Sequence, residues 1–142
     1  MYTPEQLFEN LKTIAVVGLS PDASKSSNSV AKRLQRLGLT IIPVNPTITI
    51  WDGLSVYPSV SAIPSDIEID IVDVFRREEF LVDAVKDALA RKPLPKCVWL
   101  QSGLSSNECK RLCDEAGVLY IEDSCLGVEF GFYHSQKKTT LS

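Results

Sequence analysis

Residues 13–28 read TIAVVGLSPDASKSSN, and this segment is the most informative one for the fold class. Its first part is an apolar run that ends at Gly18, as expected of a buried β-strand. A small, hydroxyl-rich loop follows and leads to Val30, Leu34 and Leu37, which have the i, i+4, i+7 spacing of a helix face. The segment therefore predicts a strand, a polar loop and a helix in succession.

Strand-like and helix-like patterns alternate along the rest of the chain. Short apolar strands separated by helices are typical of a parallel sheet that helices cover on both faces. The sequence therefore predicts an α/β fold: a doubly wound, Rossmann-like sheet of five parallel strands in the order 3-2-1-4-5. The expected strands are residues 13–18, 39–44, 69–75, 97–101 and 119–121.

Other segments are less regular. Three prolines interrupt the segment between the second and third strands, so an irregular connection is expected there. Ser105 and Glu108 have the spacing of a capping box, which predicts the start of the helix after the fourth strand. No regular element is expected after Cys125, and residues 130–142 are interpreted as a polar tail.

The composition predicts one domain that spans residues 1–142. The chain has 15 Lys and Arg against 18 Asp and Glu, which gives a net charge of −3, and 44% of its residues are hydrophobic. No apolar run approaches the roughly 18 residues of a membrane span, and charged residues interrupt the pattern of a secretory signal. We therefore expect a cytoplasmic protein that contacts neither membranes nor nucleic acid.

The cysteines and the single histidine argue against a metal site. No CxxC pair occurs among Cys97, Cys109, Cys113 and Cys125, and His134 is the only imidazole. Reduced thiols and no bound metal are the resulting interpretation. Cys125 follows the fifth strand, but the sequence supplies no cationic neighbour to activate it, so a buried or inert thiol is favoured.

The segments that directly follow the strands are the candidate binding site. Ligands of doubly wound sheets bind beyond the carboxyl ends of the strands, near the point where the strand order reverses. These segments are residues 18–28, 45–46, 75–76, 101–103 and 123–125.

The loop from Gly18 to Asn28 suits a phosphate or pyrophosphate group. Free amides at the following helix N-terminus, the positive end of that helix and the Lys25 ammonium would all favour an anion. The loop matches neither GxGxxG nor the Walker pattern, because Gly18 is its only glycine. The alternative is a solvated loop in which Ser27 or Asn28 merely caps the helix.

The region around the second strand is basic. No Asp or Glu occurs from Ala23 through Trp51, and the cations there are Lys25, Lys32, Arg33 and Arg36. An NAD site normally places a carboxylate after the second strand, whereas this strand is followed by Asn45 and Pro46. A phosphorylated ribose therefore fits better than a bare one, unless the cations only form a solvated helix face.

Phe75 and Arg76 follow the third strand at the same edge of the sheet. An aromatic ring can pack on an adenine, and a guanidinium can meet a phosphate. Phe75 could equally be a core residue, and Arg76 a surface cation. Both interpretations stay open on the residues alone.

The motifs that carry a family resemblance are IAVVGLSPD at 14–22, IPVNP at 42–46, DIVDVFRR at 70–77, VWLQSG at 98–103 and DSC at 123–125. In this order they resemble the small stand-alone CoA-binding proteins, which are similar to the CoA-binding domain of the succinyl-CoA ligase alpha subunit. The resemblance implies a Rossmann-like domain that holds coenzyme A or an acyl-CoA. It implies that the phosphates are surrounded by Gly18, Ser20, Lys25 and Ser27, and that the adenosine side is lined by Asn45, Phe75 and Arg76.

The resemblance also implies binding without ligase chemistry, because the ligases carry their phosphorylated histidine in another domain. No nucleophile and base can be paired in this sequence, so no catalytic residue is assigned. The predicted partner is thus a small nucleotide ligand, CoA or an acyl-CoA. Two alternatives are kept: an NADP-dependent oxidoreductase, and a scaffold whose crevice is vestigial.

Overall fold

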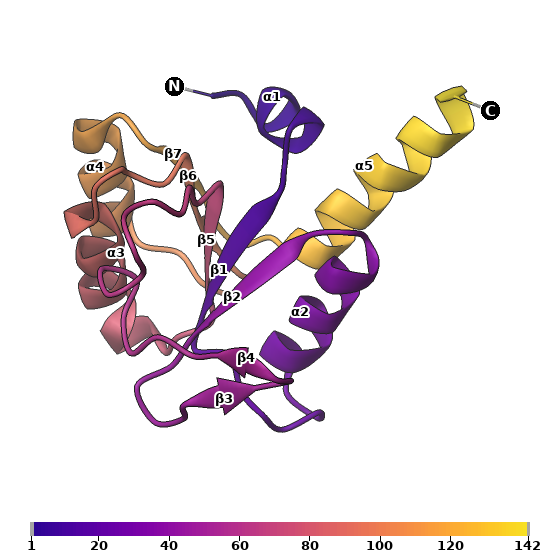
Figure 1. The fold of residues 1–142 in the computed structure, drawn as a ribbon. Helices are drawn as coiled ribbons and strands as arrows, with labels where there is room; N and C mark the ends of the chain where they lie inside the picture. Colours follow the sequence, from indigo (N-terminus) through magenta and orange to yellow (C-terminus); the bar gives the residue numbers. More distant parts are fainter. Residues whose placement is uncertain (1, 142) are drawn as a thin grey trace.

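A parallel β-sheet forms the centre of the computed structural model, which describes residues 2–141 (Figure 1). All neighbouring strands in this five-stranded sheet are parallel. The predicted fold class, a doubly wound, Rossmann-like α/β sheet, is confirmed. Its strands are β1 (Thr13–Val17), β2 (Thr40–Val44), β5 (Ile71–Val74), β6 (Cys97–Leu100) and β7 (Leu119–Ile121).

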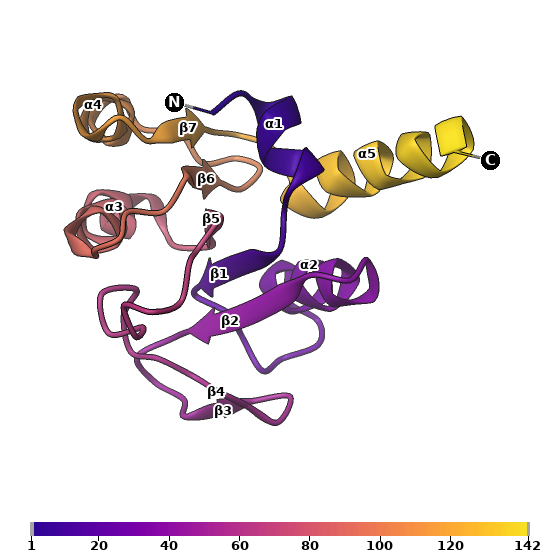
Figure 2. The ribbon, with the colours of Figure 1, turned by 45° about the horizontal axis from the view of Figure 1, so that its top comes forward.

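The helices form two layers, one on each face of the sheet (Figure 2). Each layer has its own core, because successive side chains of a strand point to opposite faces. Ala15 and Val17 of β1 belong to the core under α3 and α4, whereas Ile14 and Val16 belong to the core under α1, α2 and α5. The helices are α1 (Pro4–Glu9), α2 (Ser26–Arg36), α3 (Leu81–Ala90), α4 (Asn107–Ala116) and α5 (Leu126–Leu141), and a short 3₁₀ helix (Glu78–Phe80) precedes α3.

The strand order along the sheet is β2-β1-β5-β6-β7. The third parallel strand, β5, therefore lies directly beside β1, whereas the sequence placed it outside the second strand. The position outside β2 is held by Tyr57, which forms one parallel bridge with Val44 and exchanges 3.0 Å backbone hydrogen bonds with Pro43 and Asn45. With Tyr57 counted as a rudimentary third strand, the predicted pattern is retained, and the order reverses between β1 and β5.

The connection from β2 to β5 is largely irregular, as predicted, but it contains a small hairpin of β3 (Ile50–Trp51) and β4 (Leu54–Ser55). Trp51 is buried, and its indole nitrogen donates a hydrogen bond to the Ser20 carbonyl over 3.1 Å. The hairpin thereby holds the loop that follows β1.

The predicted start of α4 is wrong by one residue. The N-cap is Ser106, whose hydroxyl accepts a 3.1 Å hydrogen bond from the backbone nitrogen of Cys109. The predicted cap, Ser105, lies one residue outside the helix. The helix ends at Ala116, and its C-cap, Gly117, has the left-handed conformation with a φ of 73°.

The expectation of no regular element after Cys125 is also wrong, because α5 occupies 16 residues there. Gly127 and Gly131 lower the local helix propensity, which concealed the helix in the sequence. Leu126 and Phe130 are buried in the core, and the Phe130 ring meets the ring of Phe8 edge-on at 5.4 Å. Tertiary packing therefore stabilises this helix. No helix in the described part of the chain is long and apolar enough to cross a membrane.

Candidate functional site

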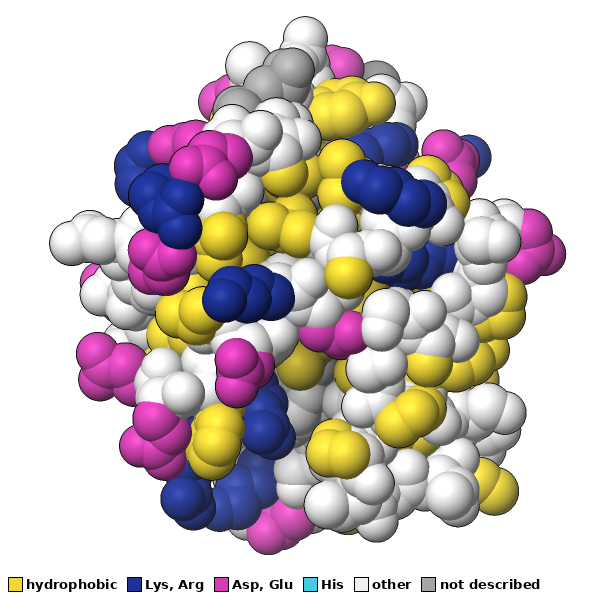
Figure 3. Space-filling view, turned by 90° about the vertical axis from the view of Figure 1, so that its left-hand side faces the viewer, with side chains coloured by type: hydrophobic (Ala, Val, Ile, Leu, Met, Phe, Trp, Pro, Cys, Tyr) yellow, Lys and Arg dark blue, Asp and Glu magenta, His cyan; other side chains and the backbone are white. Residues whose placement is uncertain are grey.

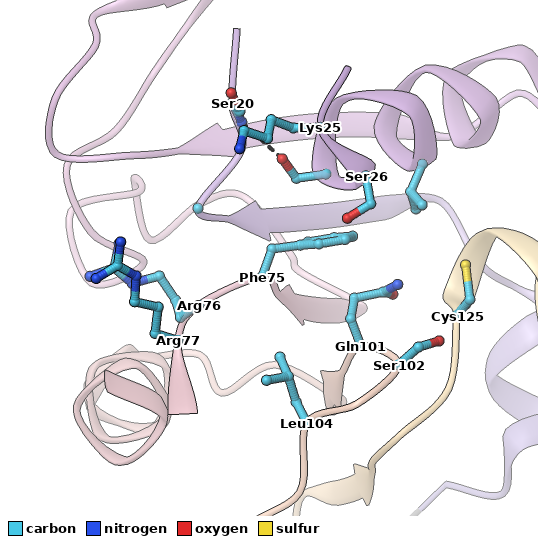
Figure 4. A pocket seen from close by; sticks show the side chains of 13 residues that line it. Ser20, Lys25, Ser26, Phe75, Arg76, Arg77, Gln101, Ser102, Leu104 and Cys125 are labelled. Carbon is cyan, nitrogen blue, oxygen red and sulfur yellow. Dashed lines mark hydrogen bonds between the residues drawn. The ribbon is translucent and has the colours of Figure 1, made fainter. Parts of the chain in front are cut away.

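A hollow of about 580 Å³ lies beyond the carboxyl ends of β1, β5 and β6 (Figure 4). This volume is typical of ligand pockets, which span about 300–1,000 Å³. The hollow brings together segments that are far apart in the sequence: the loop after β1, the first turn of α2, and the ends of β5 and β6. Its lining includes six of the predicted site residues, which are Gly18, Ser20, Lys25, Ser27, Phe75 and Arg76.

A second, smaller hollow of about 220 Å³ adjoins the first. Gly18 and Arg76 line both hollows, so the two meet at these residues. The smaller hollow extends past the end of β2 to Pro46 and Pro58, and Asp83 of α3 lies on its wall. An elongated ligand can therefore cross the sheet edge from one hollow to the other.

Gly18 is required by the contact between β1 and β5. Its φ is +83°, and a Cβ atom at this position would lie only 2.1 Å from the carbonyl oxygen of Phe75. Any side chain would push the ends of the two strands apart. Glycine is therefore dictated here by packing, before any ligand is considered.

Hydrogen bonds from neighbouring elements hold the loop after β1. The Ser20 backbone nitrogen donates to the Ser27 hydroxyl over 3.0 Å, and the Ser20 carbonyl accepts from the Asn28 side-chain amide over 2.8 Å. With the bond from Trp51, this carbonyl has two donors. The loop is thus preorganised by the chain itself.

Asn45 supports the same loop from the end of β2. Its side-chain nitrogen donates to the Leu19 carbonyl over 3.0 Å, and its side-chain oxygen accepts from the backbone nitrogen and hydroxyl of Thr47 over 2.8 and 2.7 Å. Asn45 lines neither of the two hollows. The structure places it behind the loop, where it holds the Leu19 carbonyl.

The N-terminus of α2 opens onto the larger hollow without a side-chain cap. Lys25 occupies the N-cap position, and its side chain makes no capping hydrogen bond. Ser27 and Asn28, the alternative capping residues, bond to Ser20 instead. Ser26 also lines the hollow. The positive end of a helix therefore adjoins the hollow.

Three cations, Lys25, Arg76 and Arg77, line the larger hollow, and its described lining contains no Asp or Glu. None of the three forms a salt bridge with a described residue. The Arg76 guanidinium instead lies over the ring of Phe80, with 5.0 Å between its central carbon and the ring centroid. No salt bridge therefore neutralises these cations, although the Asp22 carboxylate in the same loop interacts electrostatically with Lys25.

The outer face of α4 shows the opposite arrangement. Acidic and basic side chains lie close together on the face that α3 and α4 form (Figure 3). Lys110 pairs with Asp114 at 2.8 Å, and Arg111 pairs with both Glu108 and Glu115. The cations of this helix are neutralised within the chain, unlike those of the larger hollow.

Phe75 has both of the environments that the sequence left open. Its side chain is half-buried and packs in part against the core under α2 and α5. Its ring also lines the larger hollow, between the side chains of Ser26 and Gln101 (Figure 4). Phe75 thus joins the core to the floor of the hollow.

Two further lining residues, Gln101 and Cys125, were not assigned from the sequence. Gln101 follows β6, and its side-chain oxygen accepts a 3.1 Å hydrogen bond from the backbone nitrogen of Leu126. Cys125 is only half-buried, whereas the sequence favoured a buried or inert thiol. The one signal for both residues was their position after a strand. No signal pointed to Trp51, which holds the loop from outside the hollow.

Known proteins are similar to this chain in sequence and in fold. The protein YneT of Bacillus subtilis, itself uncharacterized, is 38% identical over 124 residues, which are 87% of this chain and 89% of YneT. A solved structure from Thermus thermophilus has a TM-score of 0.81 and 34% identity, and the match covers 88% of this chain and 92% of that one. The fold and the sequence are thus shared by small proteins of similar length.

Larger enzymes contain a related segment. The ADP-forming acetate–CoA ligase I of Archaeoglobus fulgidus is 28% identical over 126 residues, which are 82% of this chain but only 18% of the ligase. The sequence model of the family described as "CoA binding domain" matches residues 12–131 of this chain. These residues include both hollows and the loop after β1. The chain therefore belongs to the CoA-binding domain family.

Proposed function

We propose that this protein binds coenzyme A or an acyl-CoA across the two hollows and catalyses no reaction of its own. The observation that supports this best is the larger hollow, where the uncapped end of α2 meets three cations that form no salt bridge with a described residue. A ligand with several phosphates matches such a surface, because backbone amides, a helix end and cations all favour negative charge.

The diphosphate of the ligand lies over Gly18, beside Lys25 and the first turn of α2. This placement is supported by the open N-terminus of that helix and by the close approach of the backbone at Gly18. Ser20 and Ser27 complete the phosphate side, and Asn45 acts by holding the loop in shape.

The phosphorylated adenosine occupies the smaller hollow. Pro46 and Pro58 provide apolar walls for the base, and Asp83 can accept a hydrogen bond from an adenine amino group. Arg76 borders both hollows and can meet a phosphate on the ribose.

The pantetheine arm runs along the larger hollow in the opposite direction. In Figure 4, Lys25, Arg76 and Arg77 lie toward one end of this hollow, and Gln101, Ser102 and Cys125 lie at the other. Phe75 lies between the two ends and provides an apolar floor for the arm. The described lining of the larger hollow holds no imidazole or carboxylate that could act as a base.

Isothermal titration calorimetry with CoA, dephospho-CoA, NADP and NAD tests the proposal. CoA should bind most tightly, and dephospho-CoA more weakly, because it lacks the ribose phosphate that Arg76 meets. Tighter binding of NADP than of CoA would support an oxidoreductase instead. Absence of binding by all four ligands would indicate a vestigial crevice.

A further inference from the structure

Cys125 is the one cysteine that a molecule in the larger hollow can reach. All four cysteines lie in the described part of the chain, and the other three are buried. Burial raises the pKa of Cys97 and Cys109 above the ordinary thiol value and that of Cys113 to about 12, so these three stay protonated. Cys125 lines the hollow and immediately precedes α5.

Gln101 supplies a second polar group at the same end of the hollow. Only 6% of this residue is exposed. The bond from the Leu126 nitrogen to its side-chain oxygen fixes the orientation of the amide, and the remaining NH₂ group donates to no described residue. Figure 4 shows the amide and the Cys125 thiol at the same end of the hollow.

The NH₂ group of Gln101 is not enclosed in the core but lines the hollow, so it is open to an acceptor there. An acceptor supplied by a ligand would satisfy the Gln101 amide. A pantetheine arm carries an amide carbonyl close to its terminal thiol, so it offers an acceptor and a sulfur at neighbouring positions. This pair matches the amide of Gln101 and the thiol of Cys125.

We infer that Cys125 forms a mixed disulfide with the terminal sulfur of a CoA-type ligand, and that Gln101 is a positioning residue which binds the adjacent amide carbonyl. The inference rests on the proposed function, because it requires the pantetheine arm to lie in the larger hollow. It adds a covalent modification site to a binding site.

The step is a thiol–disulfide exchange with a CoA disulfide as the co-reactant. The Cys125 thiolate attacks one sulfur of that disulfide, a new sulfur–sulfur bond forms to Cys125, and the original bond breaks. The departing thiolate takes up the proton that Cys125 lost. One disulfide is consumed and one is formed, so no further oxidant is needed, and a second thiol reverses the step.

The test compares CoA disulfide with glutathione disulfide at equal concentration on the reduced full chain, with intact-mass measurement and peptide mapping over time. We expect one CoA per chain on Cys125, removed by dithiothreitol, and at least about tenfold faster labelling than by glutathione disulfide, since binding orients the reacting sulfurs. Equal rates for the two disulfides, or a CoA adduct on another cysteine, would overturn the inference.

Two variants test the roles of Cys125 and Gln101 separately. Cys125→Ser should gain no adduct; if it does not fold, peptide mapping of the unaltered chain decides the site. Gln101→Glu keeps an acceptor for the Leu126 nitrogen but removes the NH₂ donor. The new carboxylate also disfavours the Cys125 thiolate, so both labelling rates should fall, and the rate with CoA disulfide should fall about tenfold further than the rate with glutathione disulfide. A parallel fall of both rates, or no fall in either, would overturn the role of Gln101.

Calorimetry with CoA under reducing conditions distinguishes a failure of the covalent step from a failure of the proposed function. Binding of CoA without a Cys125 adduct from CoA disulfide would overturn only the covalent step. Absence of CoA binding would overturn the proposed function, and the inference with it.

Discussion

The polar groups at the two edges of the central sheet differ in whether they have partners within the chain. At the amino edge, one carboxylate oxygen of Asp70 accepts hydrogen bonds from the backbone nitrogens of Lys12 and Thr13 over 2.9 Å, and the other oxygen pairs with Lys96 at 2.9 Å. At the carboxyl edge, Lys25 and Arg76 form no salt bridge with a described residue, and α2 begins without a side-chain cap.

This difference indicates that the polar groups of one edge stabilise the fold and that those of the other edge bind a ligand. The polar groups of the amino edge have partners inside the chain, so their interactions stabilise the fold. At the carboxyl edge, the Lys25 and Arg76 side chains form no salt bridge with a described residue, so they are available to a ligand at the edge where doubly wound sheets bind them. Mutations at the first edge should change stability, and mutations at the second should change affinity.

The largest expected effect is at the amino edge. Asp70→Ala should lower the free energy of unfolding by about 3 kcal/mol, because two backbone nitrogens and the Lys96 ammonium lose their partner in a buried position. Urea denaturation measures this change, and the dissociation constant for CoA should stay the same. The control Asp114→Ala removes an exposed ion pair and should cost less than about 0.5 kcal/mol. Weaker CoA binding by Asp70→Ala without loss of stability would contradict the proposed difference between the two edges.

At the carboxyl edge, Lys25→Ala should weaken CoA binding by about 2 kcal/mol through the loss of a charge-assisted hydrogen bond. Raised salt should reduce the difference, and stability should change by less than about 0.5 kcal/mol, because Lys25 is exposed. Calorimetry at low and high salt measures the effect. Lys110→Ala removes the same charge from α4 and should leave affinity unchanged. An unaltered dissociation constant for Lys25→Ala at low salt would show that the Lys25 side chain is solvated and does not contact CoA.

Asp73 lies in β5, three residues after Asp70, but has no described partner for either carboxylate oxygen. Burial raises the pKa of its carboxyl group well above the ordinary value of 3.8. Because the folded state favours the protonated carboxyl group, this group contributes its full stabilisation below pH 3.8. The contribution is lost as the pH rises through the pKa of the folded state. The slope of unfolding free energy against pH is at most about 1.4 kcal/mol per unit.

Asp73→Asn cannot ionise, so we expect this pH dependence to disappear and the variant to gain stability relative to the unaltered chain as the pH rises from about 4. Denaturant titrations across this range measure it, with Asp114→Asn as the exposed control. Parallel stability curves for the Asp73→Asn variant and the unaltered chain would show that the buried carboxyl does not titrate.

The smallest expected effect concerns Phe75, which belongs to both the core and the hollow. Phe75→Leu keeps most of the apolar volume but loses the flat ring, so CoA affinity should fall by about 1 kcal/mol while the melting temperature changes by only a few degrees. A thermal melt and a CoA titration measure both. Phe132→Leu changes the same side chain at a position that is 65% exposed and should alter neither quantity. Loss of stability without loss of affinity would place Phe75 in the core alone.

Several features of the fold and the site follow from local patterns. The apolar runs predicted every strand of the parallel sheet, because a strand buried on both faces requires consecutive apolar residues. Gly18 and Gly117 stand where the backbone needs a positive φ, which few other residues tolerate. Residues of the loop from Gly18 to Asn28 line the hollow, because a strand, a loop and a helix in succession leave the loop at the carboxyl edge.

The remaining features depend on contacts between segments that are distant in the chain. The pairing of β5 with β1 and β6 sets its place in the sheet, and the packing of Phe130 on Phe8 supports a helix that its own residues do not indicate. Whether the Lys25 side chain and the Gln101 amide are free to bind a ligand depends on which groups the fold brings near them. Local sequence determines the conformations that a segment prefers, whereas its partners are selected only when the whole chain packs, because pairing energies arise between residues that the sequence keeps apart.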